Sequence, residues 1–276
     1  MKSPADDKAP SLLFPFCYEI QYNNLMINQY IKSVELKREN IASFEEYPFC
    51  LPAIKGIDKL ELHPKVTFFV GENGTGKSTI LESIAVAYGF NPEGGSKNFA
   101  FSTADSHSGL HGHIKLAKGV KKPKDAFFLR AESYYNVATY IDRLDSEFSF
   151  GPPIKNSYGG KSLHEQSHGE SFFALFLNRL GGHGMYILDE PEAALSPSRQ
   201  MSLISRMHEL INLDSQFIIA THSPIIMAYP DATIYEIKDT IRRVKYEETE
   251  HYQVMRAFLK NTDGMLHELM KPQSNE

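Results

Sequence analysis

The chain has 276 residues, 42% of them hydrophobic, which is enough to bury a full core in one large domain or two small ones. Its formal net charge of -5 excludes a surface that is basic throughout, although it leaves room for a local basic stripe. Two cysteines make neither a disulfide framework nor a metal pattern, and no apolar run reaches the roughly eighteen residues of a membrane span. We therefore expect a cytoplasmic protein without direct membrane insertion.

The first part of the chain is expected to combine an extension with a small sheet. Prolines and asparagines interrupt every periodic pattern in residues 1–27, which predicts a loosely ordered N-terminal extension. We expect residues 28–276 to form a single domain. Within about 30–63, apolar and polar residues alternate on both sides of a segment rich in turn-forming residues, which predicts antiparallel strands.

A β-rich segment, a glycine-rich loop and a helical pattern come next. KVTFFV at 65–70 leads into GENGTGKS, a full match to G-x-x-x-x-G-K-[ST], and residues 78–88 have an apolar helical face. In such a loop the backbone N–H groups converge on phosphate oxygens, Lys77 supplies a positive charge, and the Ser78 hydroxyl binds Mg²⁺. The motif predicts a site for ATP with Mg²⁺. The predicted nucleotide-binding residues are Gly71, Glu72, Asn73, Gly74, Thr75, Gly76, Lys77, Ser78 and Thr79.

The middle of the chain is expected to hold two strands and then helices. Strands at 113–117 and 126–131 flank the basic turn KGVKKPKD, so we expect antiparallel elements over about 111–131. The lysines of this turn are typical of a solvated loop, and the alternative is contact with nucleic acid or an acidic partner. A helical part follows over about 132–182, with helices at 132–144 and 167–180.

A second acidic motif follows the next strand. MYILDE has four apolar residues, a strand at 185–188, and then Asp189 and Glu190. A magnesium-nucleotide site needs a carboxylate from the end of a neighbouring strand. We assign Asp189 to the metal through water and Glu190 to the general base that deprotonates the attacking water. A strand that merely enters a loop is the alternative, and the preceding phosphate motif favours the catalytic reading.

The remaining pattern completes the predicted fold. We expect a helix at 198–212, a strand at 216–220, a hairpin of 233–237 with 241–246, and one or two C-terminal helices. Strands that alternate with helices predict an α/β fold, a mainly parallel sheet flanked by helices. The small antiparallel β subdomain and a short helical subdomain would be attached to it.

Three motifs in this order resemble the ABC-type ATPases, including SMC, RecF-like and transporter nucleotide-binding proteins: GENGTGKS, MYILDE and FIIATHSP. The sequence as a whole resembles a small bacterial family of stand-alone AAA/ABC-type ATPases. Residues 78–166 show no heptad repeat, so we expect a P-loop head without coiled-coil arms. The resemblance implies that His222 is the switch histidine that contacts the γ phosphate, so that Lys77, Glu190 and His222 form the catalytic set. Read alone, such a histidine is more often a capping or core residue.

The resemblance also implies a signature motif that completes the active site of an opposing subunit. The candidate is QSHGE, and its predicted trans phosphate contacts are Ser167, His168, Gly169 and Glu170. Only Ser167 and Gly169 match the usual Leu-Ser-Gly-Gly-Gln. The alternative is an ordinary helix start, with Ser167 as N-cap and Glu170 completing a capping box.

Other positions depart from the family pattern or carry weak signals. The D-loop aspartate position falls on Ser196, and the Q-loop glutamine is absent, with Arg130 and Glu132 nearest; Glu132 is a further candidate for reaching the metal through water. Tyr47 and Phe49 are typical of core residues, with stacking on adenine as the alternative. A zinc site is not expected where three histidines lie close together without cysteines or suitable spacing, at His107, His111 and His113.

The leading functional hypothesis is Mg²⁺-dependent ATP binding and hydrolysis that drives ATP-gated homodimerisation, because each subunit would hold half of each site. The process served would be DNA repair, phage defence or regulation, with nucleic acid or an unidentified protein as a further partner. The alternatives are the motor subunit of a membrane transporter, a slow ATP-dependent switch module and a small-molecule phosphotransferase. The missing Q-loop glutamine and the altered signature disfavour the transporter motor.

Overall fold

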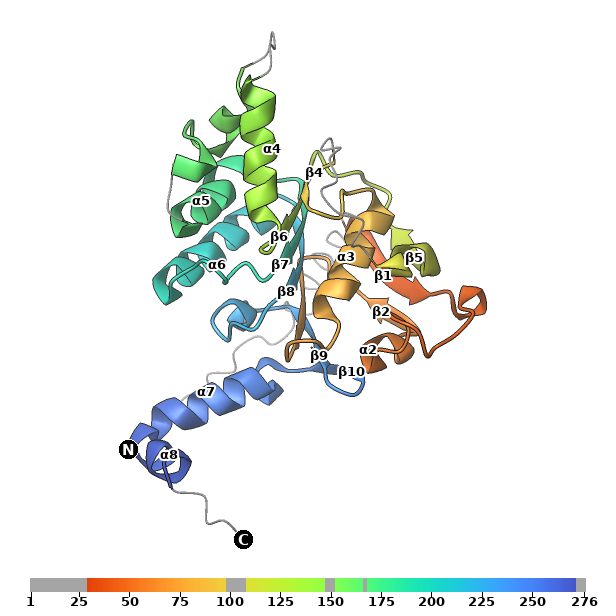
Figure 1. Ribbon diagram of the computed structural model, residues 1–276, viewed down its shortest axis with the longest axis vertical. Helices are drawn as coiled ribbons and strands as arrows, with labels where there is room; N and C mark the ends of the chain where they lie inside the picture. The colour runs from red at the N-terminus through yellow and green to blue at the C-terminus, as the bar shows by residue number, and fades with distance from the viewer. Residues whose placement is uncertain (1–28, 98–107, 147–151, 166–167, 272–276) are drawn as a thin grey trace, which may run out of the picture.

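The computed structural model describes residues 29–97, 108–146, 152–165 and 168–271, and the extension predicted for 1–27 lies outside them. Its centre is a seven-stranded sheet with the order β10-β9-β3-β8-β7-β6-β4 (Figure 1). The five inner strands are parallel, and β4 and β10 pair antiparallel at the two edges. The strands are β3 (Val66–Gly71), β4 (Gly95–Ser96), β6 (Asp125–Arg130), β7 (Gly184–Asp189), β8 (Gln216–Ala220), β9 (Thr233–Ile237) and β10 (Ile241–Val244). The predicted α/β class with a mainly parallel sheet is confirmed.

A second, three-stranded antiparallel sheet has the order β2-β1-β5 and corresponds to the predicted small subdomain. Its strands are β1 (Ile31–Leu36), β2 (Lys59–Glu61) and β5 (Ile114–Lys118). The prediction that all of 111–131 is antiparallel is wrong for its second half, since β6 runs parallel to β7 in the central sheet. Phe127, Phe128 and Leu129 of β6 are all buried, and such a continuous apolar run is typical of a strand covered on both faces.

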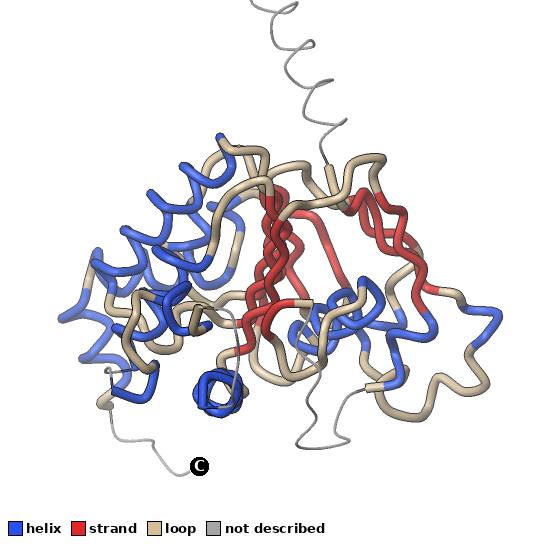
Figure 2. Tube along the Cα trace, turned by 90° about the horizontal axis from the view of Figure 1, so that it is seen from above, coloured by secondary structure: helices blue, strands red, loops and turns tan. Residues whose placement is uncertain are grey.

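Helices cover both faces of the central sheet (Figures 1 and 2). On one face lie α2 (Pro52–Lys55), α3 (Lys77–Tyr88) and the small sheet, and on the other α4 (Tyr134–Ser146), α5 (His168–Ala174) and α6 (Pro197–Asn212). Successive side chains of β3 point to opposite faces of the sheet, so they pack in different parts of the core. Phe68 packs in the cluster of α4, α5 and α6, whereas Phe69 packs in the cluster of α3. The segment 175–179 continues α5 as a π-helical turn.

The C-terminal helices differ from those of the core. Helix α7 (Glu250–Lys260) and helix α8 (Thr262–Leu269) have no buried residue, and they extend away from the central sheet (Figure 1). Within the described ranges, no helix combines the length and the apolar character needed to cross a bilayer. The short 3-10 turns are Arg38–Asn40, Gly109–His113, Ile154–Tyr158, Leu163–Glu165, Ile226–Ala228 and Tyr246–Glu248.

One buried side chain joins the small sheet to the central one. The amide nitrogen of Gln216, at the start of β8, donates to the carbonyl oxygens of Ile31 (2.8 Å) and His63 (3.0 Å). Its amide oxygen accepts from the backbone N–H groups of Tyr30 (3.0 Å) and Ile31 (2.9 Å). Because Gln216 is 1% exposed, these four hydrogen bonds replace water for every polar group involved.

Candidate active site

The glycine-rich loop leaves β3 close against the neighbouring strand β9. Gly71 has φ +147°, and a Cβ atom there would collide with the carbonyl group of Ile237, so the loop begins where only glycine fits. Lys77 opens α3, is 3% exposed, and its Nζ donates to the carbonyl oxygen of Glu72 at 2.8 Å. A cavity of about 410 Å³ lies over this loop. It is lined by Tyr47, Leu51, Asn73, Gly74, Gly76, Lys77, Ser78, Thr79, Glu132 and Glu190.

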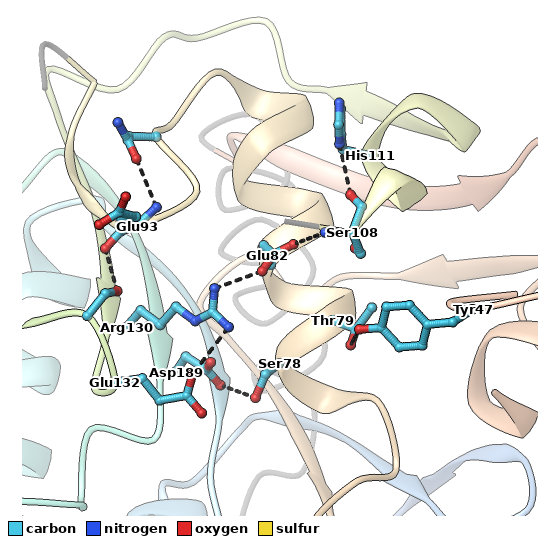
Figure 3. Close-up of polar contacts among 12 residues, drawn as sticks. Tyr47, Ser78, Thr79, Glu82, Glu93, Ser108, His111, Arg130, Glu132 and Asp189 are labelled. Carbon is cyan, nitrogen blue, oxygen red and sulfur yellow. Dashed lines mark hydrogen bonds and ion pairs between the residues drawn. The ribbon is translucent and has the colours of Figure 1, made fainter. Parts of the chain in front are cut away.

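Two oxygen groups meet at the first turn of α3. The Ser78 hydroxyl donates to Oδ1 of Asp189 at 3.0 Å (Figure 3). Asp189 ends the fully buried strand β7 and is 4% exposed, and burial raises the pKa of its carboxyl to about 7 even though the bond from Ser78 lowers it. A buried carboxyl whose charge is so poorly compensated, next to a hydroxyl oxygen, fits the oxygen ligands that Mg²⁺ prefers.

An arginine stands where the family pattern would place the Q-loop. Arg130 lies opposite Asp189 in the register of β6 and β7. Its Nη1 is 2.8 Å from Oε2 of Glu82 on α3, and its Nη2 is 3.3 Å from Oε2 of Glu132 (Figure 3). Glu132 is 79% exposed at its side chain and lines the cavity. Glu132 therefore lines the same cavity as Ser78, and one of its oxygens is paired with a guanidinium group.

Glu190 and His222 face each other beside the loop. Glu190 has φ +52°, a left-handed conformation that is unfavourable for a residue with a side chain, and its N–H donates to the carbonyl oxygen of Ala220 at 3.0 Å. Its Oε1 lies 3.4 Å from Nε2 of His222. Burial and the nearby charge of Lys77 lower the pKa of His222, although Glu190 opposes this shift. The structure thus brings Lys77, Glu190 and His222 into one electrostatic neighbourhood.

Two further residues hold His222, and the sequence analysis missed both. Oε1 of Glu192 accepts from Thr221 Oγ1 (2.8 Å) and from the backbone N–H groups of His222 (2.5 Å) and Ser223 (3.2 Å). Nε2 of His251 lies 3.1 Å from Nδ1 of His222. Glu192, two residues after Glu190, offered a weak signal by its position. His251 offered none, because only tertiary folding brings its helix to this place.

The signature segment lies elsewhere in the same chain. Ser167 is outside the described residues, and α5 begins at His168. A Cβ atom on Gly169 would lie 2.7 Å from the carbonyl oxygen of Ala194, so the start of α5 packs against the loop that follows β7. Helices α5 and α3 are on opposite faces of the sheet (Figure 1). Gly169 and Glu170 therefore are not among the residues that line the cavity of their own chain.

Several secondary candidates are also located. Tyr47 is 66% exposed, lines the cavity and places its hydroxyl 3.4 Å from Thr79 Oγ1, so the core role expected for it is wrong. Phe49 is partly buried against the core cluster of α3. The Ser196 hydroxyl accepts from the N–H of Arg199 at 3.4 Å as the N-cap of α6.

The clustered histidines make local contacts. Nδ1 of His111 is 3.1 Å from the carbonyl oxygen of Ser108, and Nδ1 of His113 is 3.1 Å from that of Gly109. Both contacts lie within the turn that precedes β5. His107 is outside the described residues.

Two family models match the chain. The first, described as "AAA domain", covers residues 35–156, and the second, described as "AAA domain, putative AbiEii toxin, Type IV TA system", covers residues 164–228. The first contains the glycine-rich loop, and the second contains the Asp189–Glu190 pair and His222. The matched segments thus include each motif that the structure gathers around the cavity.

Curated relatives and solved structures were also compared. The chain is 26% identical over 207 residues to the ribose import ATP-binding protein RbsA of Yersinia pestis, an alignment that covers 68% of this chain and spans 38% of RbsA. Similar solved structures include the SMC head domain from Thermotoga maritima (18% identity, 78% of this chain and 98% of that one, TM-score 0.38). Another is cbiO1 from Clostridium perfringens, part of the ABC transporter complex cbiONQ (18%, 88% and 100%, TM-score 0.45).

The motif matches and the observed site agree on one assignment. A buried strand, a glycine-rich loop and a helix hold Lys77, strand β7 on the other side of β8 ends in Asp189, and the two AAA-domain matches fall on these elements. The structure thus has the architecture of a P-loop domain, and its sequence is similar to AAA domains over both matched segments.

Proposed function

We propose that two copies of this chain close on ATP and Mg²⁺, hydrolyse the nucleotide and then separate. The observation that carries this proposal is the placement of α5. Its first turn packs against the loop after β7, on the face of the sheet opposite α3, whereas the P-loop cavity is open beside Tyr47 and Glu190. The signature residues Ser167, His168, Gly169 and Glu170 would then complete the cavity of the other copy, and two-fold symmetry gives two equal sites.

The side chains around the cavity suggest a division of roles in hydrolysis. Lys77 would bind the β and γ phosphates, and Ser78 and Asp189 would hold Mg²⁺, which when bound neutralises charge on the phosphate oxygens. Glu190 would take a proton from water as the water oxygen bonds to the γ phosphorus and the bond to the bridging oxygen of ADP breaks. His222 would donate from Nε2 to a γ-phosphate oxygen.

Two residues at the rim would take part in binding. Tyr47 presents an exposed ring at the edge of the cavity, where we place the adenine base in stacking contact. Glu132 would contact the metal through water, in competition with its ion pair to Arg130.

The proposal is tested by the solution mass of Glu190→Gln with and without Mg-ATP, measured by size exclusion with light scattering. Loss of the general base should preserve binding and slow hydrolysis by a factor on the order of 10² or more, so the closed pair accumulates. We expect ATP to double the mass and Ser167→Arg to prevent this. Ser202→Arg, an exposed change on α6, is the matched control and should leave dimerisation intact.

A monomeric mass with ATP bound would overturn the homodimer. The chain would then be an ATPase whose activating surface comes from another protein. Because RbsA is named a ribose import ATP-binding protein, a transporter motor is the alternative in that case. Copurification with an integral membrane protein would support it.

A basic cavity favours nucleic acid as a further partner. It has a volume of about 480 Å³, and Lys97, Lys118, Lys122, Lys124 and Arg179 are among the residues that line it. Burial and the charges of Lys118 and Lys122 lower the pKa of Lys97, and Arg179 is paired with Asp125 at 2.8 Å. A group of lysines that repel one another is favourable where phosphate groups bind between them. Such a partner suits a role in DNA repair or phage defence, with regulation as the third alternative.

Fluorescence anisotropy with labelled duplex and single strands over a salt series tests this partner. We expect affinity to fall with salt, and Lys118→Glu with Lys122→Glu to weaken binding and reduce the salt slope by about two counterions. Arg256→Glu with Lys260→Glu, both exposed on α7, is the control of equal charge change. Binding without salt dependence, or equal loss in the control, would remove nucleic acid from the proposal.

A further inference from the structure

The contact between His222 and His251 joins two distant parts of the chain. His222 follows β8, whereas His251 lies in the first turn of α7. Their facing nitrogens, Nδ1 of His222 and Nε2 of His251, are 3.1 Å apart, which is a hydrogen-bond distance. The ring centroids are 5.3 Å apart with an interplanar angle of 59°, so the rings meet through their nitrogens and are not stacked.

The beginning of α7 is fixed in place by contacts of its own. The N–H of Glu250 donates to Oε1 of the buried Glu236 at 2.9 Å, and its carboxylate pairs with Lys238 at 2.7 Å. Just before the helix, the Tyr246 hydroxyl donates to the carbonyl oxygen of Pro224 at 2.8 Å, in the same loop as His222. The position of His251 is therefore set by the fold around it, although no residue of α7 is buried.

The surroundings of both imidazoles favour the neutral form. Burial and the charge of Lys77 lower the pKa of His222, and the same two causes lower the pKa of His251. A neutral imidazole has one N–H and one acceptor nitrogen. A neutral pair joined at 3.1 Å therefore shares one proton, and which ring donates it decides the tautomer of both.

Only one of the two arrangements suits the site. If His251 donates from Nε2, then Nδ1 of His222 accepts and His222 carries its own proton on Nε2. That N–H faces Oε1 of Glu190 at 3.4 Å. In the opposite arrangement, a lone pair on His222 Nε2 would face the carboxylate, which is repulsive. Nε2 of His222 is buried and makes no hydrogen bond within the described residues, so its hydrogen-bonding capacity is unused there.

We propose that His251 is a positioning residue that holds His222 as an Nε2–H donor directed at the γ phosphate and at Glu190. This inference rests on the proposed role of His222 in hydrolysis. It assigns to the first turn of α7 a part in the chemistry of the P-loop cavity. Loss of a residue that fixes the tautomer of a histidine typically lowers activity by about 10- to 100-fold, and we expect an effect of that size here.

Kinetics provide the first test, with paired variants. His251→Leu removes the donor, and kcat for ATP hydrolysis should fall about 10- to 100-fold while KM stays within about twofold. His251→Gln keeps an amide N–H donor and should recover most of the loss. His208→Leu, on α6 with a Tyr229 contact at 3.1 Å, is the control and should retain the wild-type rate. An unchanged kcat in His251→Leu would overturn the proposal, and so would equal losses in His251→Leu and His251→Gln.

Spectroscopy gives a second test, which does not depend on turnover. The ¹⁵N shifts of labelled histidines distinguish protonated from unprotonated ring nitrogens, and comparison with His222→Asn assigns the signals. We expect Nδ1 of His222 to be unprotonated and Nε2 to carry the proton; a protonated Nδ1 would overturn the proposal. Equal ATPase rates for wild type and His222→Ala would instead remove the role of His222, whatever its tautomer.

Discussion

The nucleotide edge of the central sheet and the C-terminal helix α7 both contact His222, but they are built in opposite ways. At the nucleotide edge, all residues of β3, β7 and β8 are buried, and each of these three strands is paired on both sides. In α7 and α8 no residue is buried, and Val254, Met255 and Leu259 on α7 are each at least 45% exposed. Only the first turn of α7 is tied to the loop after β8.

The difference shows how one histidine is held from two sides. The loop after β7 holds the backbone around His222 through Glu192, which accepts hydrogen bonds from Thr221, His222 and Ser223. The helix reaches the imidazole itself by one contact. A rigid support and a weakly anchored one should respond differently to substitution, and the following changes are ordered by the size of effect we expect.

Removal of the charge at the nucleotide edge should have the largest effect. Lys77→Ala takes away a nearly buried cation that the phosphates require, and we expect ATP affinity to fall on the order of a thousandfold, beyond detection in most assays. Isothermal titration calorimetry with Mg-ATP measures this. Lys65→Ala, at the opposite end of β3, is the control. ATP binding with unchanged affinity would remove Lys77 from the site.

Loss of the hydrogen bonds that join the two sheets should come next. Gln216→Leu keeps the volume roughly constant but leaves the backbone groups of Tyr30, Ile31 and His63 buried without partners. We expect the free energy of unfolding to fall by about 3 kcal/mol or more. Urea denaturation measures it, with the exposed Gln253→Leu on α7 as control. If both variants unfold at the same urea concentration, the network contributes nothing to stability.

Core packing beneath the P-loop gives a somewhat smaller effect. Ile84 on α3 is 0% exposed in the cluster that includes Phe69 and Ile218. Ile84→Ala should destabilise the fold by at least ~2 kcal/mol, from lost burial and the cavity that remains. Thermal unfolding should show a clearly lower midpoint. A midpoint equal to that of the wild type would contradict the view that this face is tightly packed.

The smallest effect is expected for a substitution on the exposed part of α7. Leu259 on α7 is 70% exposed, so Leu259→Ser should change the free energy of unfolding by no more than ~0.5 kcal/mol. The same urea assay compares it directly with Ile84→Ala. A loss as large as that of Ile84→Ala would mean that α7 is packed in solution and would erase the contrast between the two regions.

Most of the fold was predictable from local patterns. The strand of KVTFFV, the helix after the loop and the final hairpin were each specified by periodicity and turn residues close in sequence, and the structure confirms the α/β class. The pairing of β6 was predicted wrongly, because a short apolar run is compatible with either sheet. Its partner β7 lies more than fifty residues away, beyond what neighbouring residues specify.

The candidate site was predictable where a motif supplies the chemistry. Lys77, Ser78, Asp189 and Glu190 were named from spacing alone, and the structure places them together, while their roles stay predictions. Glu192 and His251 were missed because their meaning depends on which atoms they meet. Arg130 was recognised as a departure from the family pattern, but its ion pair with Glu82 on α3 could not be predicted from the sequence.

The pairing of β3 has a consequence for the order of assembly during synthesis. Its two neighbours in the sheet are β8 and β9, which begin at Gln216 and Thr233. When the P-loop leaves the ribosome, β3 has no partner strand. Its apolar side chains stay unpaired until roughly 150 further residues have been synthesised. Contacts so distant in sequence form slowly, and an unpaired apolar strand is prone to aggregate. The phosphate-binding loop, encoded in the first third of the chain, is therefore among the last parts to reach its final place.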